Sequence, residues 1–191
     1  MIYSANTLIL DHGGAGEFDD VGPLRALEPI EVGDIYYLFY GGVKLATGYY
    51  QIGLATSRDG IGFTKDPNNP VVPLGGGGDI DEHGAYPIGV IYVRDKFYIF
   101  YIALNSGDVG VIAWASGKNP NSLTKHGKII DPPAGGTFTT VVAGPGVEYR
   151  ERETINPPGS ELAISEIFIL RYVVGFAGPT YEIRMATLKL W

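Results

Sequence analysis

The chain has 191 residues, of which 45% are hydrophobic and 18% charged, a globular composition that excludes an intrinsically disordered protein. Its formal charge of −7 offers no basic surface to phosphates and argues against a nucleic-acid partner. Without cysteine, neither a disulfide framework nor a thiolate metal site can form. The first residues lack a secretory signal, and no apolar run approaches the roughly 20 residues of a membrane helix. We therefore expect a soluble protein without a membrane partner, whose compartment stays unknown.

Three segments of the sequence are alike and define a repeat. Each begins with an apolar pair, continues into a glycine-rich or proline-rich turn, and has an apolar residue nine positions after its first residue. The segments are 9–18, 71–80 and 129–138, and their first residues are 62 and 58 positions apart. No gap is needed to align them, which is the pattern expected of a repeat protein.

Each repeat continues with the same series of apolar runs in chain order. An aromatic run comes first, at 35–40, 97–101 and 167–172, and an alanine-containing run follows at 52–56, 111–115 and 183–187. Aromatic and β-branched residues favour strands. The aromatic run of the third repeat arrives late, and we attribute the delay to a loop inserted at 149–159.

A unit of about four strands that recurs near every 60 residues is typical of a β-propeller blade. We therefore predict an all-β fold, a β-propeller made of three four-stranded blades, at about 12–74, 75–131 and 132–191. The alternative is a sandwich or barrel whose hairpins resemble one another by chance. The ungapped alignment and the repeated strand order favour the propeller.

Three blades are too few to close a ring, because propellers typically use about 4–8. The segment 6–10 has the pattern of an outer strand with no blade before it, and the third repeat stops before an outer strand. We therefore expect a head-to-tail homodimer of six blades, in which residues 1–11 complete the last blade of the partner. Such a closed ring leaves no exposed strand edge.

One part of the sequence resembles a known family. The runs YYLFYGG at 36–42, IGLATSRDG at 52–60 and NPVV at 69–72 are similar to a blade of the five-bladed propeller glycoside hydrolases, the superfamily of arabinanases, xylosidases and invertases. The resemblance implies hydrolysis by carboxylates that project into a central channel from the first strands of successive blades. It is specific for architecture and much less so for chemistry.

The positions that the resemblance assigns to those carboxylates are occupied by other residues. In that superfamily the acidic residue lies beside a proline, about ten residues before the aromatic strand. The second repeat has Tyr86-Pro87 there, and the third has Ala143-Gly144-Pro145. In the first repeat only Glu28 is available, two or three residues from the expected place. The resemblance thus predicts the fold without the usual hydrolytic residues.

Acidic residues cluster instead in the loops that enter the first strand of the first two repeats. Asp19 aligns with Asp81, and Asp20 aligns with Glu82. The resemblance places this loop on the channel face, where a ring of carboxylates could bind sugar hydroxyls or hold Ca²⁺. The alternative is that these short polar residues cap a turn, and Thr139-Thr140 of the third repeat would cap it equally well.

Two functions therefore stay open. The first is a carbohydrate-binding or structural protein with Asp20, Glu82, His83, Tyr86 and Arg25 as candidate substrate-binding residues. The alternative is an active glycoside hydrolase in which Asp19, Asp81 and Glu148 act as base, pKa tuner and acid. Glu148 is chosen because it follows the proline of the third repeat. His12 and His126 are expected in surface turns.

Overall fold

The structure, a computed structural model, describes residues 7–107, 109–134, 136–138, 147–154, 163–176 and 181–190. For the third repeat the structure describes mainly the backbone, with few side chains beyond those of Phe138, Ala186 and Leu188. The described residues contain thirteen strands and no helix, so the prediction of an all-β fold is confirmed. Within them, no helix is long and apolar enough to span a membrane.

The first repeat forms an antiparallel group of strands. These are β1 (Gly22–Ala26), β2 (Ile30–Val32), β3 (Ile35–Val43), β4 (Tyr50–Ser57) and β5 (Thr64–Lys65). The short strands β1 and β2 pair with successive parts of β3, so together they act as one interrupted first strand. The predicted aromatic run is β3, and the predicted alanine-containing run is β4.

The second repeat is a four-stranded meander of β6 (Gly84–Val93), β7 (Lys96–Leu104), β8 (Gly110–Gly117) and β9 (Thr124–Ile130). A single parallel pair, Tyr50 with Gly84, joins β4 to β6. The nine-stranded sheet therefore divides at this point into two antiparallel groups that match the first and second repeats.

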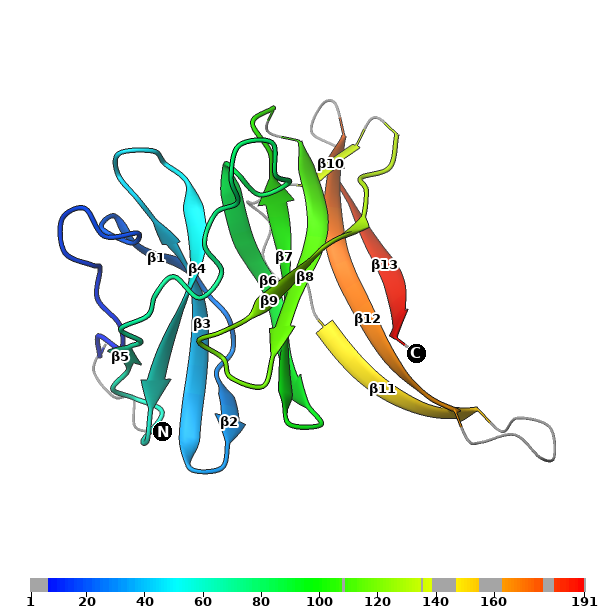
Figure 1. Cartoon of the computed structure of the whole chain (residues 1–191), viewed down its shortest axis with the longest axis horizontal. Helices are drawn as coiled ribbons and strands as arrows, with labels where there is room; N and C mark the ends of the chain where they lie inside the picture. The colour runs from blue at the N-terminus through cyan, green and yellow to red at the C-terminus, as the bar shows by residue number, and fades with distance from the viewer. Residues whose placement is uncertain are drawn as a thin grey trace, which may run out of the picture.

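The third repeat is a separate sheet of β10 (Gly136–Phe138), β11 (Val147–Thr154), β12 (Ala163–Phe176) and β13 (Tyr181–Leu190). Strands β10 and β11 pair with opposite ends of β12. They repeat the interrupted first strand of the first repeat. The three groups of strands lie side by side in chain order, with the first repeat at one end and β11–β13 at the other (Figure 1).

The core lies between neighbouring groups of strands and is organised around β7. Alternate side chains of a strand point to opposite faces. Ile99 and Tyr101 face the first repeat and pack in a cluster with Phe39. Tyr98 and Phe100 face the other way and pack in a cluster that includes Phe138. Both faces of β7 are therefore buried, which explains its nearly continuous apolar sequence.

Two predicted segments differ from the structure. Residues 7–10 form no strand within this chain, and Ile9 O accepts a hydrogen bond from Phe63 N at 3.2 Å. The loop predicted at 149–159 is wrong for its first part, since β11 runs to Thr154 and pairs with β12 along its whole length. The alternating charges of residues 150–153 fit the two-residue period of a strand as well as they fit a solvated loop. Residues 155–159 lie outside the described ones.

Candidate functional site

The loop that enters β1 is built by its own backbone and carboxylates. Gly13 N donates to Asp19 O at 2.9 Å and Glu17 N to Gly14 O at 3.0 Å. Gly14 N donates to a carboxylate oxygen of Glu17 at 3.0 Å. At the turn, Gly16 has a φ of 88°, a left-handed conformation that favours glycine.

The loop that enters β6 repeats this design bond for bond. Gly75 N donates to Asp81 O at 3.4 Å, and Asp79 N donates to Gly76 O at 3.0 Å. Gly76 N donates to Asp79 Oδ2 at 2.7 Å, and Gly78 has a φ of 91°. The two aligned segments therefore fold as one structural unit used twice.

Asp20 and Glu82 act as caps at equivalent places. Asp20 accepts bonds from Gly16 N at 3.0 Å and Leu45 N at 2.6 Å. Glu82 accepts bonds from Gly78 N and Ser106 N, both at 2.7 Å. These hydrogen bonds stabilise the charged form, so the pKa of each carboxyl is lowered, chiefly by Leu45 for Asp20 and by Ser106 for Glu82. The geometry favours the turn-capping alternative for both.

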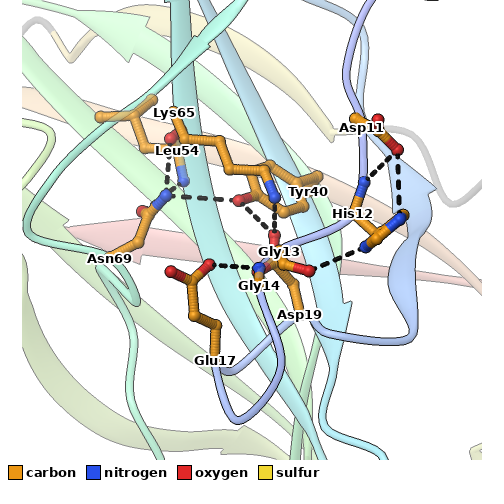
Figure 2. Close-up of polar contacts among 10 residues, drawn as sticks. All are labelled: Asp11, His12, Gly13, Gly14, Glu17, Asp19, Tyr40, Leu54, Lys65 and Asn69. Carbon is orange, nitrogen blue, oxygen red and sulfur yellow. Dashed lines mark hydrogen bonds and ion pairs between the residues drawn. The ribbon is translucent and has the colours of Figure 1, made fainter.

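Asp19 is fully buried beneath its loop, and its Oδ2 is held from two sides. Tyr40 donates its hydroxyl to Oδ2 at 3.0 Å, and Lys65 Nζ lies 2.6 Å from the same atom. Figure 2 shows the lysine and the tyrosine converging on this oxygen, with Asn69 beside them. Burial, reinforced by the nearby carboxylate of Asp19, raises the pKa of Tyr40 far above its usual range, so the hydroxyl remains a donor.

Asp81 repeats the arrangement in the second repeat. It is 2% exposed, and its Oδ2 accepts bonds from Tyr101 at 3.3 Å and from Lys125 Nζ at 2.9 Å. Burial and Asp81 raise the pKa of Tyr101 well above its usual range. Lys65 and Lys125 occupy the same register position, each opposite an alanine of the preceding strand. Sequence reasoning missed both lysines, although the pair Thr-Lys recurs at 64–65 and 124–125.

Arg25 and Tyr86 also occupy equivalent positions. Arg25 pairs with Gly41, the residue after Tyr40, and Tyr86 pairs with Ile102, the residue after Tyr101. Both side chains are half-buried, and burial lowers the pKa of Arg25. Glu28 is exposed in the connection between β1 and β2.

Four aromatic rings meet where β4 joins β6. Tyr50 stacks on Tyr86 with ring centres 4.0 Å apart, and Tyr49 stacks on His83 with centres 4.5 Å apart. We call these residues the aromatic seam. Sequence reasoning found His83 and Tyr86 but missed Tyr49 and Tyr50, whose signal is the adjacent tyrosine pair before the alanine-containing strand. The strand partner of Arg25, Gly41, lies against Tyr50 and Pro87.

Comparisons with known proteins identify the fold. No family model and no curated protein matches the chain. Among solved structures, Zg3597, a family 117 glycoside hydrolase of Zobellia galactanivorans, has a TM-score of 0.60 at 16% identity, over 95% of this chain and 57% of that one. A putative glycoside hydrolase of Bacteroides ovatus has a TM-score of 0.56 at 15% identity, over 87% and 52%. The GH32 β-fructofuranosidase BmSUC1 of Bombyx mori has a TM-score of 0.55 at 15% identity, over 83% and 32%.

The chain has a propeller-like glycoside hydrolase fold. The predicted resemblance is thus confirmed at the level of the fold, at low sequence identity. The chain spans 57% of the length of Zg3597, 52% of the Bacteroides ovatus protein and 32% of BmSUC1. A shared fold does not carry a shared reaction, so chemistry has to be argued from the residues themselves.

The remaining candidates are placed as follows in this propeller-like fold. Glu148 lies in β11 opposite Ile169, and its side chain lies outside the described residues. His12 is exposed in a loop, as predicted. His126 is exposed as predicted but lies on strand β9 and not in a turn, where it stacks on Trp114 with ring centres 4.1 Å apart. In the part of the chain that the structure describes, no three His, Asp or Glu side chains gather in a way that could hold a metal ion.

Proposed function

We propose that this protein is a carbohydrate-binding propeller without the usual hydrolytic carboxylates. The observation that carries the proposal is the equivalence of Arg25 and Tyr86 on the first strands of two successive units. Hydrolysis of a glycoside needs two carboxyl groups on opposite sides of the scissile bond. Arginine and tyrosine cannot supply them, but both can donate hydrogen bonds to sugar hydroxyls.

The aromatic seam supports the same function. Sugars present flat C–H faces that pack on aromatic rings, and a tyrosine adds a hydroxyl for orientation. Tyr49, Tyr50, His83 and Tyr86 are all half-buried, so each ring keeps part of its surface open to solvent. Arg25, on β1, adds a fixed positive charge and several hydrogen-bond donors. Such a surface suits a neutral or uronic-acid-bearing polysaccharide.

The test is affinity electrophoresis in gels that contain arabinan, xylan or inulin, together with calorimetry on sucrose and short oligosaccharides. We expect at least one polysaccharide to retard the wild-type chain. In Tyr86→Ala the affinity should fall by about fivefold, because a stacked aromatic contributes about 1 kcal/mol. Tyr36→Ala is the matched control, since Tyr36 lies on β3 outside the seam. A wild-type chain that none of these gels retards would contradict the proposal.

The alternative function is hydrolysis of a glycoside by Asp19, Asp81 and Glu148. The shared fold with glycoside hydrolases and the position of Glu148 on β11 favour it. The contacts of Asp19 and Asp81 count against it, because in each a lysine and a tyrosine hydroxyl already occupy the Oδ2 atom. A panel of aryl arabinosides, xylosides, fructosides and mannosides decides. Turnover that Asp19→Asn abolishes would establish the alternative. Absence of turnover on the whole panel would favour the carbohydrate-binding function.

We further propose that the ring is six-bladed and closed by a second copy of the chain. Ile9 is 43% exposed and Leu8 beside it 74%, whereas Val71, which occupies the place of Ile9 in the second repeat, is 5% exposed. Among the described strands β13 pairs with β12 alone. Residues 7–10 of one copy on β13 of the other would bury these apolar side chains and pair both edges. Light scattering should give the dimer mass and, for Ile9→Asp, the monomer mass. A wild-type monomer would overturn this closure.

A further inference from the structure

Each of the first two repeats carries a pocket whose lining shares no residue with the aromatic seam. In the first repeat a cavity of about 380 Å³ is lined by Glu17, Phe18, Asp19, Lys65, Asp66, Pro67, Asn69 and Pro70. In the second repeat a cavity of about 330 Å³ is lined by Gly78, Asp79, Ile80, Asp81, Tyr101, Lys125, Gly127 and Lys128. Both cavities lie beside the last strand of their unit, β5 or β9, and we call them the rim pockets.

The rim pockets are equivalent by sequence and by register. Asp19 and Phe18 in one correspond to Asp81 and Ile80 in the other, 62 positions later. The lysine comes from the same register position in both, as described above for β5 and β9. A carboxylate, an ammonium and an apolar side chain therefore recur together in each pocket. Because the same loop design builds both, a ligand that fits one is expected to fit the other.

The polar groups of the pockets retain unused hydrogen-bonding capacity. Asp19 Oδ1 is buried and accepts no hydrogen bond from the residues that the structure describes. An ammonium has three donors. Lys65 Nζ forms an ion pair with Asp19 Oδ2 but makes no hydrogen bond to the described residues, and Lys125 donates two hydrogen bonds, to Asp81 Oδ2 and Pro73 O. A buried acceptor without a partner costs about 1–3 kcal/mol, which a ligand hydroxyl would recover.

The charges of the pockets restrict the class of ligand. The aspartate in each offsets its lysine. The first pocket adds the carboxylates of Glu17 and Asp66, which would repel an anion, and the second adds Asp79 and Lys128, whose charges offset each other. The described carboxylates do not gather into a metal site. A neutral ligand that both donates and accepts hydrogen bonds fits this pairing, and vicinal hydroxyl groups do both. Phe18 or Ile80 would contact its apolar face.

We propose that the two rim pockets are equivalent binding sites for a neutral sugar ring, separate from the aromatic seam. Their volumes lie at the small end of the range of small-molecule pockets, about 300–1,000 Å³, which fits one or two rings. The third repeat has Thr139 at the position of the aspartate, so two sites per chain are expected. Two weak sites on one chain gain avidity for a branched or repetitive polysaccharide.

The test is an NMR titration of the ¹⁵N-labelled full chain with methyl xylopyranoside, methyl arabinofuranoside and methyl mannopyranoside. At least one probe should cause saturable shifts of the amides in both loops, 13–20 and 75–82. The double variant Asp19→Asn, Lys65→Met should lose the shifts in the first loop only, and Asp81→Asn, Lys125→Met those in the second only. Each double variant removes both charges of a pair, so neither leaves a buried charge alone.

Three further variants keep the outcome interpretable. Lys65→Arg retains the ion pair but fills the pocket, so it should lose the shifts of the first loop even if the double variant unfolds. Lys118→Met, at an exposed lysine outside both pockets, should change nothing. Tyr86→Ala should leave the rim shifts intact, which separates this proposal from binding at the seam. Absence of saturable shifts with all three probes, or shifts that survive in both double variants, would overturn the proposal.

Discussion

Gly13 passes so close to Asp19 that a methyl group on Gly13 would clash with Asp19 Oδ1 and would lie 2.6 Å from a carboxylate oxygen of Glu17. In the second repeat, a methyl group on Gly75 would lie 2.5 Å from Asp81 Oδ1. Glycine at these positions is what allows the buried aspartate to fold back under its own loop. This contact is a structural reason for glycine at the start of both glycine-rich turns.

Substitution of Gly13 by alanine should therefore destabilise the protein. Overpacking of this kind costs about 1–3 kcal/mol, because the carboxylate and the loop must shift together. Gly14→Ala is the matched control, since the nearest atom to its added carbon would be 3.7 Å away. Urea unfolding measures both. Equal free energies of unfolding for the two variants would show that the close approach does not constrain the loop.

Removal of Lys65 should be more damaging than removal of the whole ion pair. Lys65→Met leaves Asp19 buried without its counter-charge, and breaking a buried pair in this way costs about 3–5 kcal/mol. Asp19→Asn, Lys65→Met should recover a large part of that loss, because no lone charge remains. Lys118→Met, an exposed lysine, should cost little. The prediction fails if the single and double variants unfold at the same urea concentration.

The stability of the protein should decrease as the pH falls below about 6.5, in part through His126. Partial burial, with the charge of Lys96, lowers the pKa of this histidine below the value 6.5 of a free histidine. The unfolded chain then binds a proton at a pH where the folded chain does not, so stability is full above 6.5 and decreases toward the folded pKa. His126→Gln should make this decrease shallower, whereas His12→Gln should not. Thermal unfolding between pH 7.5 and 5 measures it.

Acid should loosen the two entry loops through Asp20 and Glu82. Hydrogen bonds from backbone amides lower the pKa of Asp20 below the value 3.8 of a free aspartate, and that of Glu82 below the value 4.5 of a free glutamate. The stabilisation is therefore present above those values and is lost as the pH falls through the lower folded pKa values. Asn and Gln at these positions should reduce stability at pH 7 and flatten its decrease below pH 4.5. Amide exchange in 13–20 and 75–82 reports the loops directly. Unchanged exchange in both variants would contradict the capping role.

Much of the fold was predictable from the sequence, because strands leave a local record. Runs such as 35–40 and 97–101 combine apolar and β-branched residues within one strand, and the ungapped segments 9–18 and 71–80 marked equal places in the chain. In the structure the two runs are strands β3 and β7, and the two aligned segments belong to loops with the same pattern of backbone hydrogen bonds. Residues 149–154 form part of strand β11 where the sequence predicts a loop, because a strand of alternating charges and a solvated loop share the same local pattern.

The site was less predictable, because it depends on which residues meet across the sheet. The sequence by itself determined that the acidic residues of the entry loops are equivalent and that no carboxylate lies beside Pro87. Only the tertiary structure decided that Asp19 lies buried against Lys65, 46 positions later in the chain, and that Tyr49 and Tyr50 meet His83 and Tyr86. Burial and pairing are properties of the packed strands, and they decide whether a carboxylate serves as an acid, a ligand or a structural ion pair.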